Sequence, residues 1–92
     1  MTGITKRGME LIEIGDVIAT KPYGKGKRIM YEVSGIDKIS SVAQDYWVVT
    51  GVRLVKDKWH PGEYVSFGWN KGFFVRIGED APFGYENIGR LR

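Results

Sequence analysis

Apolar and polar residues alternate along most of this 92-residue chain, and this period of two constrains the fold more than any other feature. Ile29, Tyr31 and Val33, for example, are separated by single residues. Successive side chains of a β-strand point to opposite faces of the sheet, so this spacing indicates a half-buried strand. Similar patterns occur in residues 11–20, 47–55, 64–69 and 73–77. The sequence therefore predicts five β-strands and an all-β fold.

Turn-forming residues separate the predicted strands. Residues 69–73 suit a three-residue hairpin loop in which Gly72 takes the left-handed conformation. Pro61 and Gly62 suit a type II turn, because proline fixes the first central φ and glycine accepts the positive second one. Residues 81–84 predict another chain reversal.

Two features interrupt the alternation. Gly15 lies inside the first predicted strand, where we expect a bulge or a bend. Residues 37–45 lack the strand pattern, and Ser41 with Gln44 has the spacing of a capping box. We therefore expect a single helical turn in this segment, too short to serve as a core helix.

Five short antiparallel strands must bury one face of the sheet and protect its two edges. At this size the usual solution is a small, strongly bent barrel. We predict one domain over residues 9–92, an SH3-like barrel with an OB-like barrel or a small sandwich as alternatives, after a flexible segment at 1–8. Trp69, in phase with Phe67, is expected to pack in the core. The other predicted core residues are Leu11, Ile14, Val17, Ile29, Tyr31, Val33, Val48, Val52, Leu54, Val65, Phe67, Phe73 and Val75.

Composition narrows the class of protein. The chain has no cysteine, so neither a disulfide nor a thiolate zinc site holds the fold, which fits a reducing compartment. No apolar run approaches the ~20 residues that span a bilayer, and residues 1–8 lack the apolar region of a signal peptide. We therefore expect a cytoplasmic protein that does not bind membranes.

The residues that usually carry catalysis or hold metal are sparse. His60 is the only histidine, and Asp57 and Glu63 are the only carboxylates near it in the sequence. Zinc sites normally draw on more histidine or cysteine ligands, so we expect no metal and no cofactor. The serines have no nucleophile-elbow context, and we expect a protein that is not an enzyme.

Positive charge is concentrated in one segment. The net charge is only +3, but residues 17–31 hold four cations and no acid. Lysine and arginine on a glycine-rich loop can follow a phosphate backbone, and a tyrosine within it can stack on a base. The candidate nucleic-acid-binding residues are Lys21, Tyr23, Lys25, Lys27 and Arg28.

The same segment resembles a known motif. Gly15, Asp16 and Ile18 lead into a Gly-Lys-Gly-Lys run at residues 24–27, and a strand rich in isoleucine and valine follows. Over residues 14–36 this order is similar to the KOW motif of SH3-like barrels in ribosomal proteins and transcription elongation factors. The resemblance implies a binding module that contacts RNA or a transcription or translation assembly.

An exposed aromatic face offers a second interpretation. Aromatic residues concentrate at the hot spots of protein interfaces, and Trp47, Trp59 and Phe74 are the candidate partner-binding residues. They fit a regulatory inhibitor or adaptor that binds a protein, of the kind that small viral genomes encode against host enzymes. A homo-oligomer paired through this face is a third interpretation.

Overall fold

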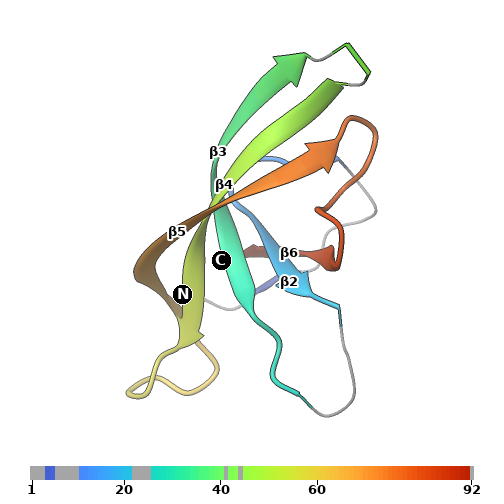
Figure 1. The fold of residues 1–92 in the computed structure, drawn as a ribbon. Helices are drawn as coiled ribbons and strands as arrows, with labels where there is room; N and C mark the ends of the chain where they lie inside the picture. Colours follow the sequence, from blue (N-terminus) through green and yellow to red (C-terminus); the bar gives the residue numbers. More distant parts are fainter. Residues whose placement is uncertain (1–3, 6–10, 22–25, 41, 44, 92) are drawn as a thin grey trace.

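The computed structural model describes residues 4–5, 11–21, 26–40, 42–43 and 45–91. These residues form a single antiparallel sheet in the order β1-β6-β2-β3-β4-β5 (Figure 1), and the predicted all-β class is confirmed. The strands are β1 (Ile4–Thr5), β2 (Asp16–Thr20), β3 (Met30–Ser40), β4 (Asp45–Lys56), β5 (Tyr64–Arg76) and β6 (Tyr85–Leu91). No described segment is a helix that could cross a membrane.

The predicted hairpin at residues 69–73 is wrong. β5 runs without interruption through this segment, where Lys71 pairs with Gly51 of β4. Gly72 does not adopt a positive φ, whereas Gly68 does, at 83°. Residues 67–69 lie together opposite Arg53 alone, which makes a bulge in β5. The backbone hydrogen bonds to β4 outweigh the local turn preference of these residues, as tertiary pairing often does in strands.

The predicted break at residues 37–45 is also wrong for most of its length. β3 continues to Ser40 and β4 begins at Asp45, so the two strands form a long hairpin. Ser41 and Gln44, the basis of the expected helical turn, lie outside the described residues. Strand pairing is favoured at residues 37–40 and 45 because each paired residue gains inter-strand hydrogen bonds. An isolated helical turn would form one hydrogen bond at a high entropic cost.

The other predicted turns are confirmed. Gly62 has a φ of 87°, and the N–H of Glu63 donates to the carbonyl of His60 at 3.1 Å. Gly84 has a φ of 83°, and the N–H of Tyr85 donates to the carbonyl of Pro82 at 3.0 Å. The second turn leads directly into β6, a strand that the alternation did not reveal.

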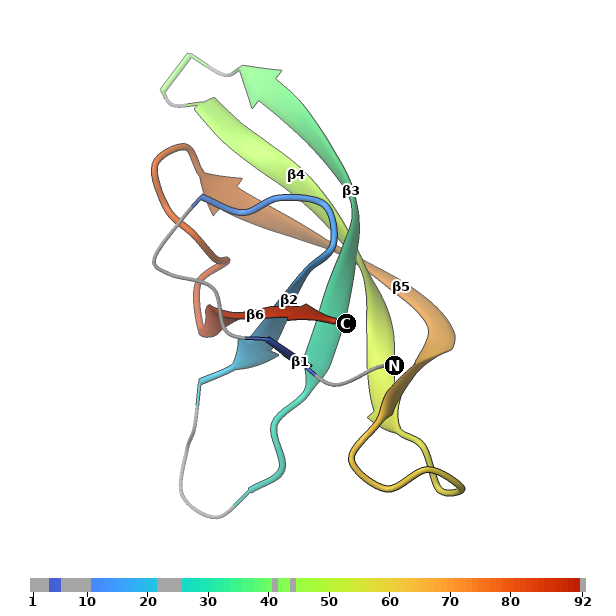
Figure 2. The same ribbon diagram turned by 180° about the vertical axis from the view of Figure 1, so that it is seen from behind.

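The sheet is strongly curled, as the two opposite views show (Figure 1, Figure 2). Hydrogen bonding between described residues leaves it open, with β1 and β5 as its edges. The curl nevertheless brings side chains of β5 and β6 together, although three strands separate them in the sheet. The ring of Phe73 lies 4.9 Å from that of Tyr85 and 5.2 Å from that of Tyr31, centroid to centroid. These edge-to-face contacts hold the inner face together.

The core lies on this inner face and confirms part of the predicted set. Its cluster consists of Ile12, Ile18, Tyr31, Val33, Val49, Phe73, Val75 and Ala81. The predicted residues that are buried are Val17, Tyr31, Val33, Leu54, Phe73 and Val75. The exposed ones, for which the prediction is wrong, are Leu11, Ile14, Ile29, Val65, Phe67 and Trp69. Val48 and Val52 are half-buried, whereas Val49, between them in β4, is fully buried.

Gly51 allows the closest approach between strands in the core. A Cβ added there would lie 2.8 Å from the Cβ of Tyr31, whereas one added at Gly35 would lie 3.9 Å from Thr50. We expect Gly51→Ala to lower the free energy of unfolding by about 1–3 kcal/mol through overpacking. Gly35→Ala, the matched control, should be neutral or stabilising in the same urea titration. Equal stability of the two variants would contradict this account.

A buried carboxylate joins the start of β2 to β6. Asp16 is fully buried, and its carboxylate accepts hydrogen bonds from the N–H of Glu13 at 2.9 Å and Nδ2 of Asn87 at 2.8 Å. Nε of Arg90 donates to it at 3.0 Å. These contacts hold the turn before β2, where Gly15 has a φ of 95°, as the predicted bend requires.

Candidate nucleic-acid interface

Two loops leave the same end of the sheet. The β2–β3 loop (residues 21–29) precedes β3, and the β4–β5 loop (residues 57–63) follows β4. Because β3 and β4 are antiparallel and Met30 pairs with Leu54, the start of β3 lies beside the end of β4. In Figures 1 and 2, residues 26–29 and the β4–β5 loop lie at the lower end of the molecule, which we call the loop end.

The β2–β3 loop contributes exposed lysines to the loop end. The side chains of Lys21 and Lys27 are exposed, as expected for residues that contact phosphates. The backbone N–H of Lys21 donates to the carbonyl of Gly84 at 3.0 Å, which fixes this side of the loop against the turn before β6. Tyr23 and Lys25, also predicted to bind nucleic acid, lie outside the described residues.

Arg28 differs from these lysines because it is already engaged within the protein. Its Nε donates to the carbonyl of Thr20 at 2.8 Å, and its guanidinium forms an ion pair with Glu86 of β6. The side chain is only partly exposed. Arg28 therefore ties the base of the loop to the sheet, and a ligand would compete with Glu86 for it.

The β4–β5 loop presents a tryptophan flanked by charge. Trp59 is 85% exposed, and Lys56 and Lys58 are exposed beside it. The N–H of Trp59 donates to Oδ1 of Asp57 at 2.9 Å, and the N–H of Asp57 donates to the carbonyl of Glu63 at 3.0 Å. These bonds close the loop, and the indole is exposed on it. Neither lysine is predicted from the sequence to bind nucleic acid, because Asp57 lies between them and the segment does not read as a run of positive charge.

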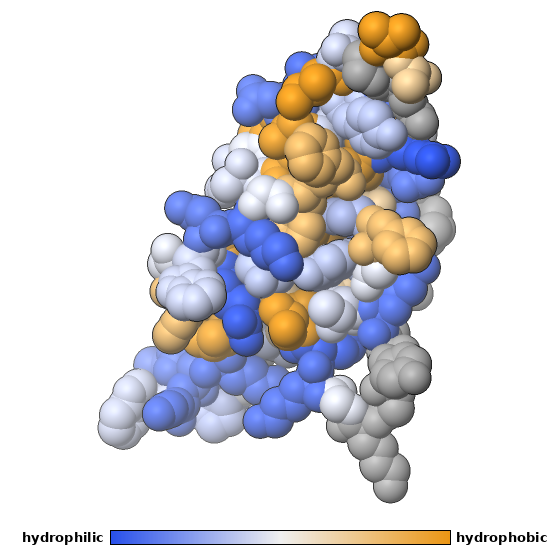
Figure 3. All heavy atoms as spheres, viewed as in Figure 1, coloured by the Kyte–Doolittle hydropathy of each residue, from blue (hydrophilic) through white to orange (hydrophobic). Residues whose placement is uncertain are grey.

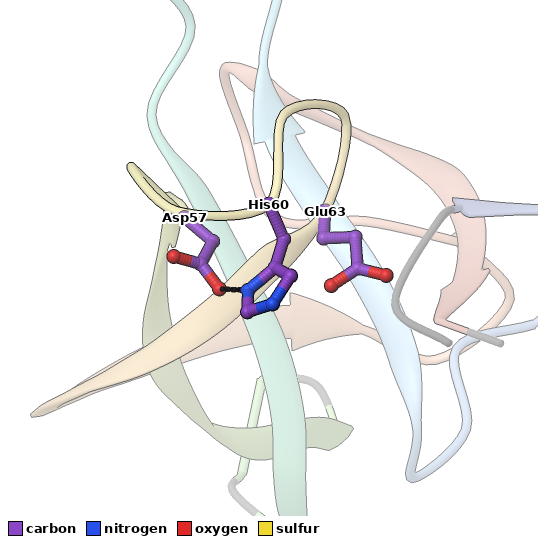
Figure 4. Close-up of side chains that lie close together, drawn as sticks. All are labelled: Asp57, His60 and Glu63. Carbon is purple, nitrogen blue, oxygen red and sulfur yellow. Dashed lines mark hydrogen bonds and ion pairs between the residues drawn. The ribbon is translucent and has the colours of Figure 1, made fainter.

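Asp57, His60 and Glu63 form a titratable cluster in the same loop. In Figure 4 the imidazole lies between the two carboxylates, and its Nδ1 is 2.8 Å from Oδ2 of Asp57. Hydrogen bonds from the Trp59 N–H and from His60 lower the pKa of Asp57. The hydrogen bond to Asp57 and its negative charge raise the pKa of His60, with a smaller contribution from Glu63. The imidazolium therefore persists to higher pH than in a free histidine.

The three predicted partner-binding residues are not brought together. Trp59 lies at the loop end, whereas Phe74 is 68% exposed on the outer face of the sheet beside Tyr46, 6.4 Å between ring centroids. Trp47 is half-buried and packs against the core cluster. A shallow hollow of about 380 Å³ lies next to Phe74 and is also lined by Phe83. Trp59 and Phe74 thus lie on two separate surfaces.

The chain gives no significant match to any protein-family model, curated protein or solved structure. Hydrophilic side chains predominate at the loop end, while apolar ones are more frequent over the upper strands on the face shown (Figure 3). The loop end thus combines exposed cations with one projecting indole.

Proposed function

We propose that this protein is a non-enzymatic binding module that contacts single-stranded nucleic acid through its loop end. One observation carries the proposal: the antiparallel order of β3 and β4 brings the lysine-bearing β2–β3 loop and the Trp59 loop to one end of the sheet. The resemblance of residues 14–36 to the KOW motif supports the same function, with a strongly bent SH3-like sheet as the scaffold.

The charges at the loop end favour a phosphate backbone. Lys27 and Lys58 are exposed, and neither forms an ion pair with another described residue. Two of the nearby acids are engaged: Glu86 pairs with Arg28, and Asp57 accepts hydrogen bonds within its own loop. Lysines that are not neutralised locally can displace the counterions of a phosphate chain, and this release favours binding at low salt.

Trp59 favours a single strand over a duplex. An exposed indole can stack on any unpaired base, and each such contact is worth about 1–3 kcal/mol. In a duplex the base faces are already stacked on one another and are closed to the indole. Lysines from two neighbouring loops, with an aromatic ring among them, therefore match a flexible strand that winds between the loops.

Fluorescence anisotropy with labelled single-stranded and duplex oligonucleotides tests the proposal. We expect the single strand to bind more tightly, and Trp59→Ala to weaken its binding by about 5- to 150-fold, the equivalent of 1–3 kcal/mol. The double variant Lys27→Ala/Lys58→Ala should reduce the slope of log K against log salt by about 1.4, since each contact to a single strand contributes about 0.7.

Two cations at the opposite end of the sheet provide the matched control. Lys38→Ala/Arg76→Ala removes the same charge from the region where β3 and β5 flank Trp47 and Tyr46. Its salt slope should equal that of the unmodified protein. An equal loss in both double variants would show attraction by net charge alone. Absence of binding at about 50 mM salt would refute the proposal, and a protein partner at the outer aromatic face would then be the leading alternative.

A further inference from the structure

The Asp57–His60–Glu63 cluster has a feature that nucleic-acid binding leaves unexplained. Each residue offers one donor atom, and the three donor atoms lie within 4.8 Å of one another. Two carboxylates and a single imidazole come together in a loop that otherwise presents lysines. In a basic surface, a pair of carboxylates facing one imidazole is a local excess of negative charge that a cation can neutralise.

Two of the three donor atoms already have about the spacing of two ligands on one metal ion. Zinc binds imidazole nitrogen and carboxylate oxygen at about 2.0–2.2 Å, so two donors on one ion are about 3.0–3.5 Å apart at octahedral or tetrahedral angles. Nδ1 of His60 and Oδ2 of Asp57, at 2.8 Å, already lie near that separation. Replacement of the shared proton by a metal ion requires only a small opening of this pair, and Glu63 can approach by rotation about its side-chain torsions.

The backbone of the loop is organised before any ligand arrives. The N–H of Asp57 donates to the carbonyl of Glu63 at 3.0 Å, and the N–H of Glu63 donates to that of His60 at 3.1 Å. Gly62, with a φ of 87°, permits the turn between the last two donors. The three residues are therefore held on one side of a closed loop (Figure 4), so that binding orders few further torsions.

We propose that Asp57, His60 and Glu63 bind a late first-row divalent metal ion of the Zn²⁺ class. His60 contributes Nδ1, each carboxylate contributes one oxygen, and water completes the shell. An imidazole donor selects Zn²⁺ over Mg²⁺ and Ca²⁺, which prefer oxygen ligands alone. The sequence argues against metal because only one histidine is present, but the folded loop brings two carboxylates within 4.8 Å of it. This inference is independent of nucleic-acid binding.

Isothermal titration of the full chain with ZnCl₂, without nucleic acid, tests the site. We expect one equivalent to bind, with a rise in Tm because the ion stabilises the folded state, and with reversal by EDTA. The imidazole ¹⁵N resonances should show coordination at Nδ1 of His60. His60→Ala and Glu63→Gln should each weaken Zn²⁺ binding by about tenfold or more. MgCl₂ and CaCl₂ should give no comparable heat.

Controls separate this site from general attraction of metal to carboxylates. Glu79→Gln removes an exposed carboxylate outside the cluster and should leave the affinity for Zn²⁺ unchanged. The substituted side chains of the test variants lie in an exposed loop, and an unaltered Tm without metal confirms that these variants fold. Absence of Zn²⁺ binding, full retention of affinity in His60→Ala, or equal binding of Ca²⁺ would each overturn the proposal.

Discussion

Asp16→Ala should lower the free energy of unfolding by about 2–6 kcal/mol, because two hydrogen-bond donors lose their acceptor at about 1–3 kcal/mol each. The carboxylate of Asp16 is fully buried and accepts hydrogen bonds from Glu13, Asn87 and Arg90. Alanine leaves the N–H of Glu13 and Nδ2 of Asn87 without their acceptor, whereas Arg90 keeps its ion pair with the Glu13 carboxylate. Urea denaturation followed by tryptophan fluorescence measures the change, and we expect a lower midpoint with little change in slope.

An exposed acid provides the control for Asp16. Glu79→Ala also removes one carboxylate, but from an exposed position, and should alter the free energy of unfolding by no more than about 0.5 kcal/mol. If the two variants were equally stable, the link between the turn at Glu13 and β6 would not contribute to the fold as we describe it.

The second large effect is expected at the aromatic contact that maintains the curl of the sheet. Phe73 is 6% exposed and its ring contacts both Tyr31 and Tyr85. Phe73→Ala should lower the free energy of unfolding by about 3–5 kcal/mol, through the lost burial of the ring and the cavity left behind. The Phe73 ring on β5 contacts the ring of Tyr85 on β6 and helps to fix its surroundings. Near-ultraviolet circular dichroism of Phe73→Ala should therefore show weaker tyrosine signals even where the variant remains folded.

Phe83 supplies a control with the same side chain. It is fully exposed, in the turn that precedes β6, so Phe83→Ala removes the same atoms without loss of burial. Its free energy of unfolding should stay within about 0.5 kcal/mol of the original. A comparable loss of stability in both variants would contradict the assignment of Phe73 to the core.

The spacing of apolar residues predicts most of the β-strands correctly, but it does not always show which residues of a strand face the core. Tyr31 and Val33 are predicted correctly as core residues because the polar Glu32 lies between them. In β4, residues 47–49 are all apolar, so the alternation does not show that Val49 rather than Val48 faces inward. In β5 the turn-like residues before Phe73 pair with β4, and no local signal reveals this because the cause is contact with residues about twenty positions earlier.

In the candidate site, too, features that depend on neighbours in the sequence could be predicted, whereas those that depend on distant residues could not. The exposure of Trp59 is consistent with its place in a polar turn. The role of Arg28 could not be predicted, since its partner Glu86 is 58 residues away in the chain. Likewise, the sequence identified each member of the Asp57–His60–Glu63 cluster, but only the folded loop shows that their donor atoms converge.

The bulge in β5 has a consequence for the behaviour of the protein at high concentration. β5 is an edge strand of 13 residues with exposed apolar side chains, which is the kind of surface on which further chains can add and grow into fibres. The bulge at residues 67–69 bends this edge and divides its free hydrogen-bonding groups into two shorter rows. An incoming strand cannot follow both rows in one register. We therefore expect the bulge at Gly68 to disfavour the growth of fibres from this edge.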